Sequence, residues 1–173
     1  MGINKINLRA LELDDLEFLF EIENNRKLWK VSYTILPFSR YHLEKYIKES
    51  NHDIFTEKQF RFVISMGNKN PVGLIDLFDF DPLNHRAGVG IAIDGVYRRK
   101  GYAFESIKLI EDISKKDLQI HQLYVNVGIE NKISLDLFKK LGYVEIGIKK
   151  DWNYIDGQYR DEVFLQKILN NEF

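Results

Sequence analysis

The chain has 173 residues, and its 45% hydrophobic content with only 3 prolines is typical of one folded domain. Its 25 Lys and Arg residues nearly balance 26 Asp and Glu residues, and this formal net charge of -1 disfavours nucleic-acid binders, which usually carry a basic excess. The sequence contains no cysteine, which excludes disulfides, thiolate zinc sites and a cysteine nucleophile.

The first half of the chain predicts one strand, two helices and a meander of three strands. Residues 3–9 alternate apolar and polar side chains, which is typical of a half-buried strand. From Asp14 the apolar residues recur at helical spacing, and a second helix is expected after the break at Pro37, with Ser39 as its N-cap. Apolar runs separated by turn residues predict the meander strands at 59–66, 71–80 and 87–93.

The second half predicts helices that alternate with strands and a closing hairpin. Gly142 is a suitable residue to end a helix, because glycine adopts the left-handed conformation without strain. Asp156-Gly157 is a strong two-residue turn signal between two strands. The predicted elements are a helix over 103–113, a strand over 122–127, a helix over 133–141 and strands over 143–154 and 159–165.

The order of these elements predicts an α/β (α+β) fold, with a mixed, mainly antiparallel sheet of about seven strands flanked by about four helices. No linker, repeat or low-complexity stretch divides the chain, so residues 1–173 are expected to form a single domain. The 4 histidines show no metal-ligand spacing, and no metal is expected. The lack of a membrane-spanning apolar run and of a signal-peptide core indicates a cytoplasmic protein without a membrane partner.

A basic loop, Arg98-Arg99-Lys100-Gly101-Tyr102-Ala103, leads from the last meander strand into the following helix. The first turn of a helix has N–H groups without internal partners and a partial positive charge, which together favour a phosphate anion. Gly101 lets the backbone approach a ligand closely, and the basic side chains add charge. The alternative is an ordinary basic helix start, and the loop by itself leaves both interpretations open.

Several segments of the chain resemble the GNAT N-acetyltransferase superfamily. Arg98-x-x-Gly101-x-Ala103 matches its cofactor motif Gln/Arg-x-x-Gly-x-Gly/Ala, and its second cofactor segment is similar to Asn131-x-x-Ser134-x-x-x-Phe138-x-Lys140-x-Gly142-Tyr143. The opening Leu8-Arg9-Ala10-Leu11-Glu12-x-Asp14-Asp15 and the closing Asp156-Gly157-Gln158-Tyr159-Arg160-Asp161 resemble the branch of spermidine acetyltransferases and ribosomal-protein N-terminal acetyltransferases. The resemblance spans nearly the whole chain and implies one GNAT-type acetyltransferase domain.

The resemblance implies that acetyl-CoA is the co-substrate and that no metal takes part. The strand before the basic loop would splay from its neighbour and pair with the pantetheine arm, and the helix N-terminus would bind the pyrophosphate. Asn131 would reach the pantetheine, cap its helix or do both, and Phe138 would lie near the thioester or pack in the core. The implied cofactor-binding residues are Ile91, Ala92, Ile93, Arg98, Arg99, Lys100, Gly101, Tyr102, Ala103, Asn131, Ser134 and Phe138.

Two positions depart from the catalytic pattern of this branch. Its members transfer the acetyl group by direct attack of an amine in a ternary complex, often with a tyrosine protonating the departing sulfur, where this chain has Phe138. The spermidine-type relatives carry a glutamate where this chain has Gly88. Asp76 aligns with another acidic position and is the candidate base, directly or through water; its alternative is a solvated carboxylate. Tyr143 or a water molecule is the candidate substitute for the acid.

The resemblance implies N-acetylation of a primary amine but does not define the acceptor. Polyamine-binding relatives have an acidic pair after the first helix, whereas residues 29–38 contain no carboxylate. This difference weakens the assignment of a polycation as the acceptor. Trp29, Tyr33, Trp152 and Tyr154 are candidates for an acceptor pocket or for the core. A small-molecule amine is favoured; the alternatives are a peptide amine at a protein N-terminus or a non-catalytic CoA-binding module, and a homodimer is a candidate assembly.

Overall fold

The alternating runs form one continuous sheet in the computed structural model, which describes residues 5–32, 34–49, 53–67 and 70–169. In these residues the strands hydrogen-bond in the order β1-β2-β3-β4-β5-β7-β6, and each neighbouring pair is antiparallel except β4 with β5. The predicted mixed, mainly antiparallel sheet is therefore confirmed. The strands are β1 (Ile6–Ala10), β2 (Phe60–Met66), β3 (Asn70–Asp81), β4 (Arg86–Ile93), β5 (Gln122–Gly128), β6 (Val144–Ile155) and β7 (Gln158–Ile168).

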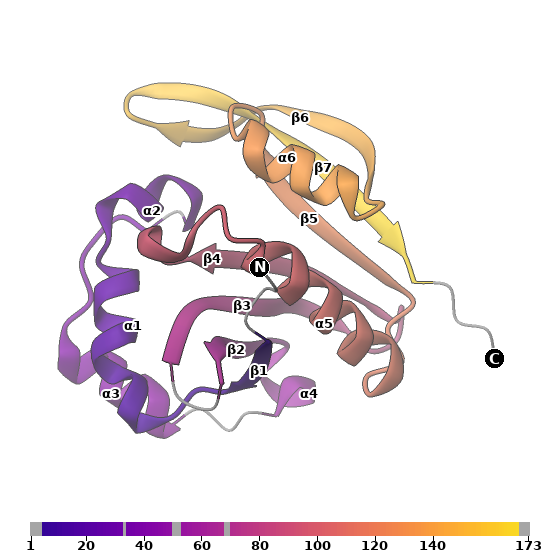
Figure 1. Cartoon of the computed structure of the whole chain (residues 1–173). Helices are drawn as coiled ribbons and strands as arrows, with labels where there is room; N and C mark the ends of the chain where they lie inside the picture. The colour runs from indigo at the N-terminus through magenta and orange to yellow at the C-terminus, as the bar shows by residue number, and fades with distance from the viewer. Residues whose placement is uncertain (1–4, 33, 50–52, 68–69, 170–173) are drawn as a thin grey trace.

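Helices lie on both sides of this sheet (Figure 1). The four predicted helices correspond to α1, α3, α5 and α6, and two short helices, α2 and α4, are additional. In the described part of the chain the α-helices are α1 (Leu16–Glu23), α2 (Arg26–Ser32), α3 (Arg40–Glu49), α4 (Ile54–Glu57), α5 (Tyr102–Lys116) and α6 (Lys132–Lys140). None of the described helices is long and apolar enough to cross a membrane.

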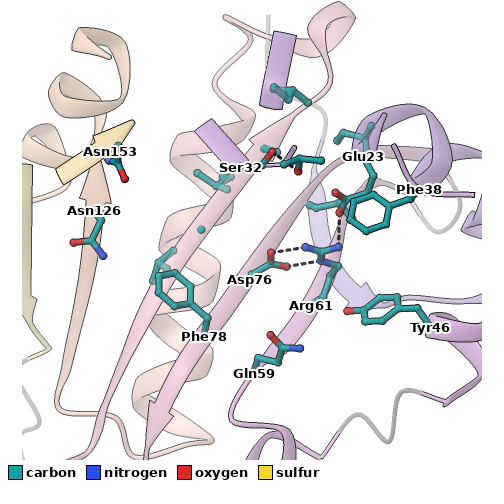
Figure 2. A pocket seen from close by; sticks show the side chains of 18 of the residues that line it. Glu23, Ser32, Phe38, Tyr46, Gln59, Arg61, Asp76, Phe78, Asn126 and Asn153 are labelled. Atoms are coloured by element: carbon teal, nitrogen blue, oxygen red, sulfur yellow. Dashed lines mark hydrogen bonds and ion pairs between the residues drawn. The ribbon is translucent and has the colours of Figure 1, made fainter. Parts of the chain in front are cut away.

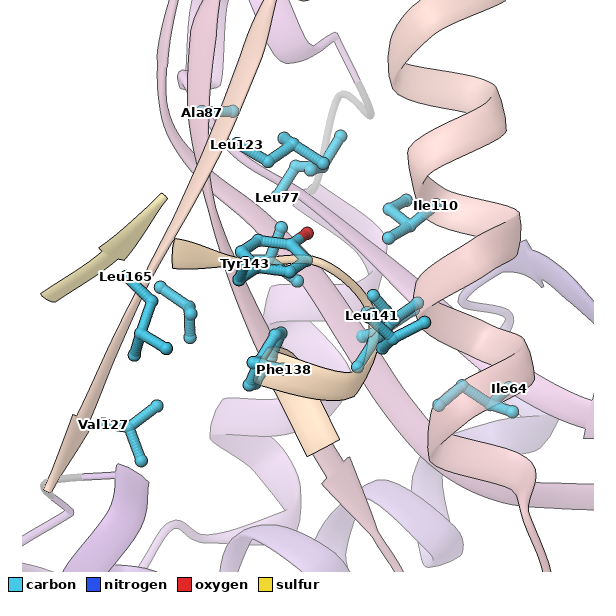
Figure 3. Close-up of a cluster of buried hydrophobic side chains, with 14 of the residues drawn as sticks. Ile64, Leu77, Ala87, Ile110, Leu123, Val127, Phe138, Leu141, Tyr143 and Leu165 are labelled. Carbon is cyan, nitrogen blue, oxygen red and sulfur yellow. The ribbon is translucent and has the colours of Figure 1, made fainter. Parts of the chain in front are cut away.

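The apolar side chains of β2 and β3 divide between two cores, one on each face of the sheet. Ile64 and Ile75 pack in the core that α5 and α6 cover, part of which is drawn in Figure 3. Val63 and Leu74, their neighbours in sequence, pack in the core formed with α1, α2 and α3. Because both faces are covered, these strands read as nearly continuous apolar runs rather than as strict alternation.

The parallel pair β4–β5 separates soon after it begins. The two strands pair at Arg86 with Gln122, Ala87 with Leu123 and Gly88 with Tyr124, and they form no further described pairs. On its other side β4 stays paired with β3 as far as Ile93, and β5 stays paired with β7. The sheet therefore opens between β4 and β5, as the resemblance implied, and one backbone edge of β4 is left outside the ladder.

The turns and helix ends of the structure also agree with the predictions from the sequence. The Ser39 hydroxyl oxygen accepts a hydrogen bond from the backbone N–H of His42 at 3.1 Å, which confirms the predicted cap of α3. Asp156 and Gly157 have φ of +50° and +79°, the left-handed values that a two-residue hairpin turn of type I′ requires. Gly142, with φ of +88°, follows α6 and ends it as expected.

The opening segment is held by an ion pair between Arg9 in β1 and Asp15 just before α1. Both guanidinium–carboxylate distances are 2.7 Å, and an oxygen of Asp15 also accepts the N–H of Glu12 at 2.9 Å. Burial opposes the charge of the Asp15 carboxylate, but its hydrogen bonds with Arg9 and Glu12 outweigh burial and lower its pKa. The opening motif thus ties the first strand to the first helix.

Phe78 fills the space that a side chain at position 88 would need. A Cβ atom added to Gly88 would lie 2.4 Å from Cε2 and Cζ of Phe78, closer than real Cβ contacts. The Phe78 ring packs edge-on against Tyr124, with 5.8 Å between the ring centroids. The absence of a side chain at position 88 and the position of this ring therefore depend on each other.

We predict that Gly88→Ala lowers the free energy of unfolding by about 1–3 kcal/mol, because the Phe78 ring must move. In Phe78→Leu the smaller side chain leaves room, so adding Gly88→Ala to that variant should cost less than in the parent. Urea denaturation of the single and double variants measures this coupling. Additive effects of the two substitutions would contradict the prediction.

We predict that Asp15→Asn lowers the free energy of unfolding at pH 7 by about 1.5–3 kcal/mol, because charged hydrogen bonds to Arg9 are lost. Since the folded-state pKa of Asp15 is below its ordinary value of 3.8, the ionised carboxylate stabilises the fold above that value. This contribution disappears as the pH falls through the folded-state pKa. Urea denaturation of both proteins from pH 7 to pH 3 should show a shrinking difference, and a constant difference would refute this role.

Candidate functional site

The N-terminus of α5 lies at the end of the loop that leaves β4. Gly101 precedes the helix with φ of +84°, and Arg99 has φ of +60°, so the loop turns sharply before Tyr102. The Arg98 Nε donates to the carbonyl oxygen of Ile93 at 3.0 Å, which holds the loop against the end of β4. The N–H groups of the first helical turn have no acceptor within the helix, which is the geometry that the predicted backbone anion site requires.

The side chains of this loop have different surroundings. Tyr102 is buried, and its hydroxyl donates to Sδ of Met66 at 2.9 Å, so only its backbone is available to a ligand. The Lys100 ammonium lies 5.3 Å from the ring centroid of Tyr97, and Ala103 packs partly against the sheet core. The predicted anion site therefore depends on backbone groups with basic side chains around them.

A cavity of about 230 Å³ lies where β4 and β5 have separated. Its walls are residues 89–91 of β4, residues 125–128 of β5, the loop before α6, one face of α6 and part of the β6–β7 hairpin. Of the three strand residues predicted to contact a cofactor, Ile91 lines this cavity, whereas Ala92 lines only a neighbouring one and the Ile93 side chain is in the core. The open backbone edge of β4 borders the space between the strands.

Three predicted residues on and before α6 line this smaller cavity: Asn131, Ser134 and Phe138. The Asn131 side-chain oxygen accepts the N–H of Ser134 at 3.2 Å, so the capping alternative is confirmed and the amide still borders the cavity. Phe138 is 2% exposed and packs edge-on against Tyr143, with 5.0 Å between the ring centroids (Figure 3). Phe138 is thus a core residue whose ring also forms part of the cavity wall.

Tyr143 lines neither cavity in the described residues. Its side chain is buried in the core beside Phe138 (Figure 3). Burial raises the pKa of the Tyr143 phenol, and the nearby carboxylate of Glu111 raises it further. This placement gives no support to Tyr143 as a substitute acid.

A larger cavity of about 850 Å³ lies between the sheet and the helices α1–α3 (Figure 2). It meets the smaller cavity at the opening between β4 and β5, because five residues line both. The shared residues are Val89, Gly90, Ile91, Asn126 and Asn153. Two separate molecules that entered the two cavities would therefore meet at the middle of β4.

One wall of the larger cavity carries an arginine between two carboxylates (Figure 2). Arg61 of β2 donates from Nε and Nη2 to the two oxygens of Asp76 at 2.8 and 2.9 Å, and from Nη1 to Glu23 at 2.6 Å. Burial lowers the pKa of Arg61, but the charges of Asp76 and Glu23 raise it by more. Asp76, the predicted base, thus lines the cavity but is held by an arginine rather than by apolar neighbours alone.

The opposite wall carries a second charged cluster. The Lys149 ammonium of β6 donates to the side-chain oxygen of Asn126 at 2.8 Å and to Oε1 of Glu162 at 3.1 Å. The amide of Asn153 donates to the other oxygen of Glu162 at 3.0 Å. Glu162 is 3% exposed, so its charge requires these partners.

The predicted acceptor aromatics are not brought together. The Trp29 indole donates to the carbonyl oxygen of Glu23 at 2.8 Å and lies outside the described cavity walls. Tyr154 is 68% exposed on the closing hairpin, 5.1 Å from the ring centroid of Tyr159, and also lies outside them. Tyr33 lies outside the described residues, whereas Trp152 lines the larger cavity.

Sequence reasoning missed the three residues that organise the charges of the larger cavity: Arg61, Lys149 and Glu162. A usable signal was present for Arg61, which is a charged residue within a strand that is otherwise largely apolar. The partners of these three residues are distant in sequence, however, and Glu23 is 38 positions from Arg61. Among the described residues no group of three or more histidines or acidic residues is arranged to hold a metal ion.

Comparison with known proteins agrees with this geometry. A family model described as an acetyltransferase (GNAT) domain matches residues 5–144. Spermidine N(1)-acetyltransferase of Vibrio cholerae is 30% identical over 158 residues, which cover 91% of this chain and 90% of that protein. The ribosomal protein uS5 alanine N-acetyltransferase of Escherichia coli is 34% identical over 79 residues, which cover 46% of this chain and 41% of that protein.

Solved structures extend the similarity to three dimensions. The crystal structure of the Vibrio cholerae spermidine N-acetyltransferase in complex with CoA and spermine has a TM-score of 0.87 and 29% identity, and the match covers 95% of each chain. Another structure of that enzyme, with a TM-score of 0.81, is described as dodecameric in an intermediate state. The family model covers most of the chain, and the strands separate beside a helix N-terminus as the resemblance implied, so the chain belongs to the GNAT family of acetyltransferases.

Proposed function

We propose that residues 1–173 act as one domain that transfers the acetyl group of acetyl-CoA to a primary amine of a small molecule, by direct attack in a ternary complex. The observation that carries this proposal is the meeting of two cavities at the middle of β4, between Val89 and Ile91. One cavity lies where β4 and β5 separate, and the other lies under the helices α1–α3. Such an arrangement suits two substrates that react where they touch.

On the cofactor side, the pyrophosphate of acetyl-CoA binds the first-turn amides of α5, from Arg99 to Ala103. The pantetheine arm pairs with the open edge of β4 and passes the walls formed by Asn131 and Ser134. The thioester then reaches the opening near Phe138. These backbone groups need an acceptor or donor, because unpaired polar groups are costly away from water.

On the amine side, the acceptor occupies the larger cavity and must lose a proton before it attacks, since a primary alkyl amine has a pKa of about 10.4. Asp76 is the candidate that accepts this proton, directly or through water. Both of its oxygens bind Arg61, but each carboxylate oxygen has a second lone pair that remains able to accept. Arg61 therefore orients the carboxylate of Asp76.

Phe138 stands at the position where the relatives often carry the tyrosine that protonates the departing sulfur. A thiol has a pKa of about 8.5, so the thiolate leaves without a general acid and takes its proton from water. Losing one general acid costs on the order of 100-fold in rate. This is compatible with a slower enzyme of the same class.

We predict that Gly101→Glu weakens CoA binding by about 100-fold or more, because a carboxylate would face the pyrophosphate at the anion site. Isothermal titration calorimetry with CoA measures the affinity. Lys108→Glu, an exposed position on the same helix, is the control for a change of overall charge and should bind nearly as the parent does. Equal affinity of Gly101→Glu and the parent would refute the assigned pyrophosphate site.

We predict that Asp76→Asn lowers kcat by about 100-fold while the affinity for CoA stays unchanged, because an amide does not accept the ammonium proton. Thiol release from acetyl-CoA with a panel of primary amines measures kcat. Asp79→Asn, an exposed position of the same strand, is the matched control. If Asp76→Asn keeps the parental kcat, Asp76 has no part in proton transfer.

A further inference from the structure

The surroundings of Lys149 are those of a binding site for a primary ammonium group. Its Nζ contacts the Asn126 and Glu162 oxygens at 2.8 and 3.1 Å. It also lies 4.8 Å from the ring centroid of Trp152 and 5.6 Å from that of Phe164. A carboxylate, an amide oxygen and aromatic faces are the groups by which proteins recognise an alkylammonium.

This ammonium site lies inside the proposed acceptor cavity. Lys149, Glu162 and Trp152 line the larger cavity, and Asn126 lines both cavities. Figure 2 shows Asn126 and Asn153 across the cavity from Asp76 and Arg61. An acceptor whose reacting amine is near β4 would therefore direct its remaining length either toward Arg61 or toward Lys149.

The chain supplies its own cation to each carboxylate of this cavity. Within the described residues the lining carboxylates are Glu23, Asp76 and Glu162, and Arg61 binds the first two. Lys149 binds the third. When the reacting amine is at Asp76, a second ammonium directed to the opposite wall would meet the like charge of Lys149, where partial burial keeps the repulsion strong.

We propose that Lys149 occupies the place of a second acceptor ammonium and thereby makes the cavity selective for amines with a single positive charge. Lys149 is then a specificity-determining residue, and the substrate class is a monoamine rather than a polyamine. The inference rests on the proposed function, because it takes the larger cavity as the acceptor site. It requires no chemistry beyond ion pairing.

The test uses butylamine and 1,4-diaminobutane, which share a four-carbon chain and differ by one amine. Their affinities for the CoA-bound protein are measured by calorimetry at pH 7, and kcat/KM is measured by thiol release. The parent should bind the diamine no more tightly than the monoamine. In Lys149→Met the diamine should gain about tenfold relative to the monoamine, because its second ammonium then reaches Glu162.

Lys150→Met is the matched control, because Lys150 carries the same charge one position along β6. Its side chain is 74% exposed and pairs with Asp161 at 2.7 Å, so its removal should leave the diamine preference unchanged. Lys149→Gln keeps an amide donor toward Glu162 and is a second variant with the same expected gain. Lys149→Met/Glu162→Gln removes both charges and should lose the gain.

Unchanged relative affinities in both Lys149 variants would overturn the proposal, as would an equal gain in Lys150→Met or in the double variant. A loss of kcat for both amines without a change in their affinity ratio would also overturn it. Failure of the proposed function has a different signature: CoA binds, but no amine releases free thiol. The affinity ratio still decides the role of Lys149 in that case, because binding is measured without turnover.

Discussion

The early end of the β4–β5 pairing is the constraint on which the rest of the molecule depends. A parallel pair needs a crossover between its strands, and here α5 makes that crossover and begins close to the end of β4. Pairing stops after Gly88, so β4 presents backbone groups that its neighbour does not satisfy. One break in the ladder thus creates the opening between the strands, where the two cavities meet.

The charges of the larger cavity follow from a second constraint, which is the cost of an unpaired charge away from water. Asp76 lies in an apolar stretch of β3 and Glu162 is buried in β7, and each pairs with a cation from another strand. These ion pairs make the cavity polar without leaving a free negative surface. The ion pairs that stabilise these carboxylates in the cavity therefore also determine how the carboxylates can interact with a ligand.

Predictions held where the signal is local in the chain. The Ser39 and Asn131 caps and the turn at Asp156-Gly157 each depend on a few adjacent residues, and the structure has all three. Side-chain roles that depend on distant partners were harder to predict. Trp29 is aromatic and close in sequence to the expected acceptor region, yet its indole is directed to the end of α1. Aromatic character alone does not distinguish a residue that lines a cavity from one that packs elsewhere in the fold.

The sequence by itself determined the order and type of the main elements and the GNAT family resemblance, and it predicted a backbone anion site, because hydrophobic period, turn residues and a glycine before a helix act over short ranges. Only the tertiary structure decided which charged side chains meet. Arg61 pairs with Glu23 and Asp76, and Lys149 pairs with Glu162, because strand register and helix packing bring remote segments together. The acceptor side of the molecule therefore became visible only in the folded chain, since its chemistry is set by contacts between segments that no local pattern connects.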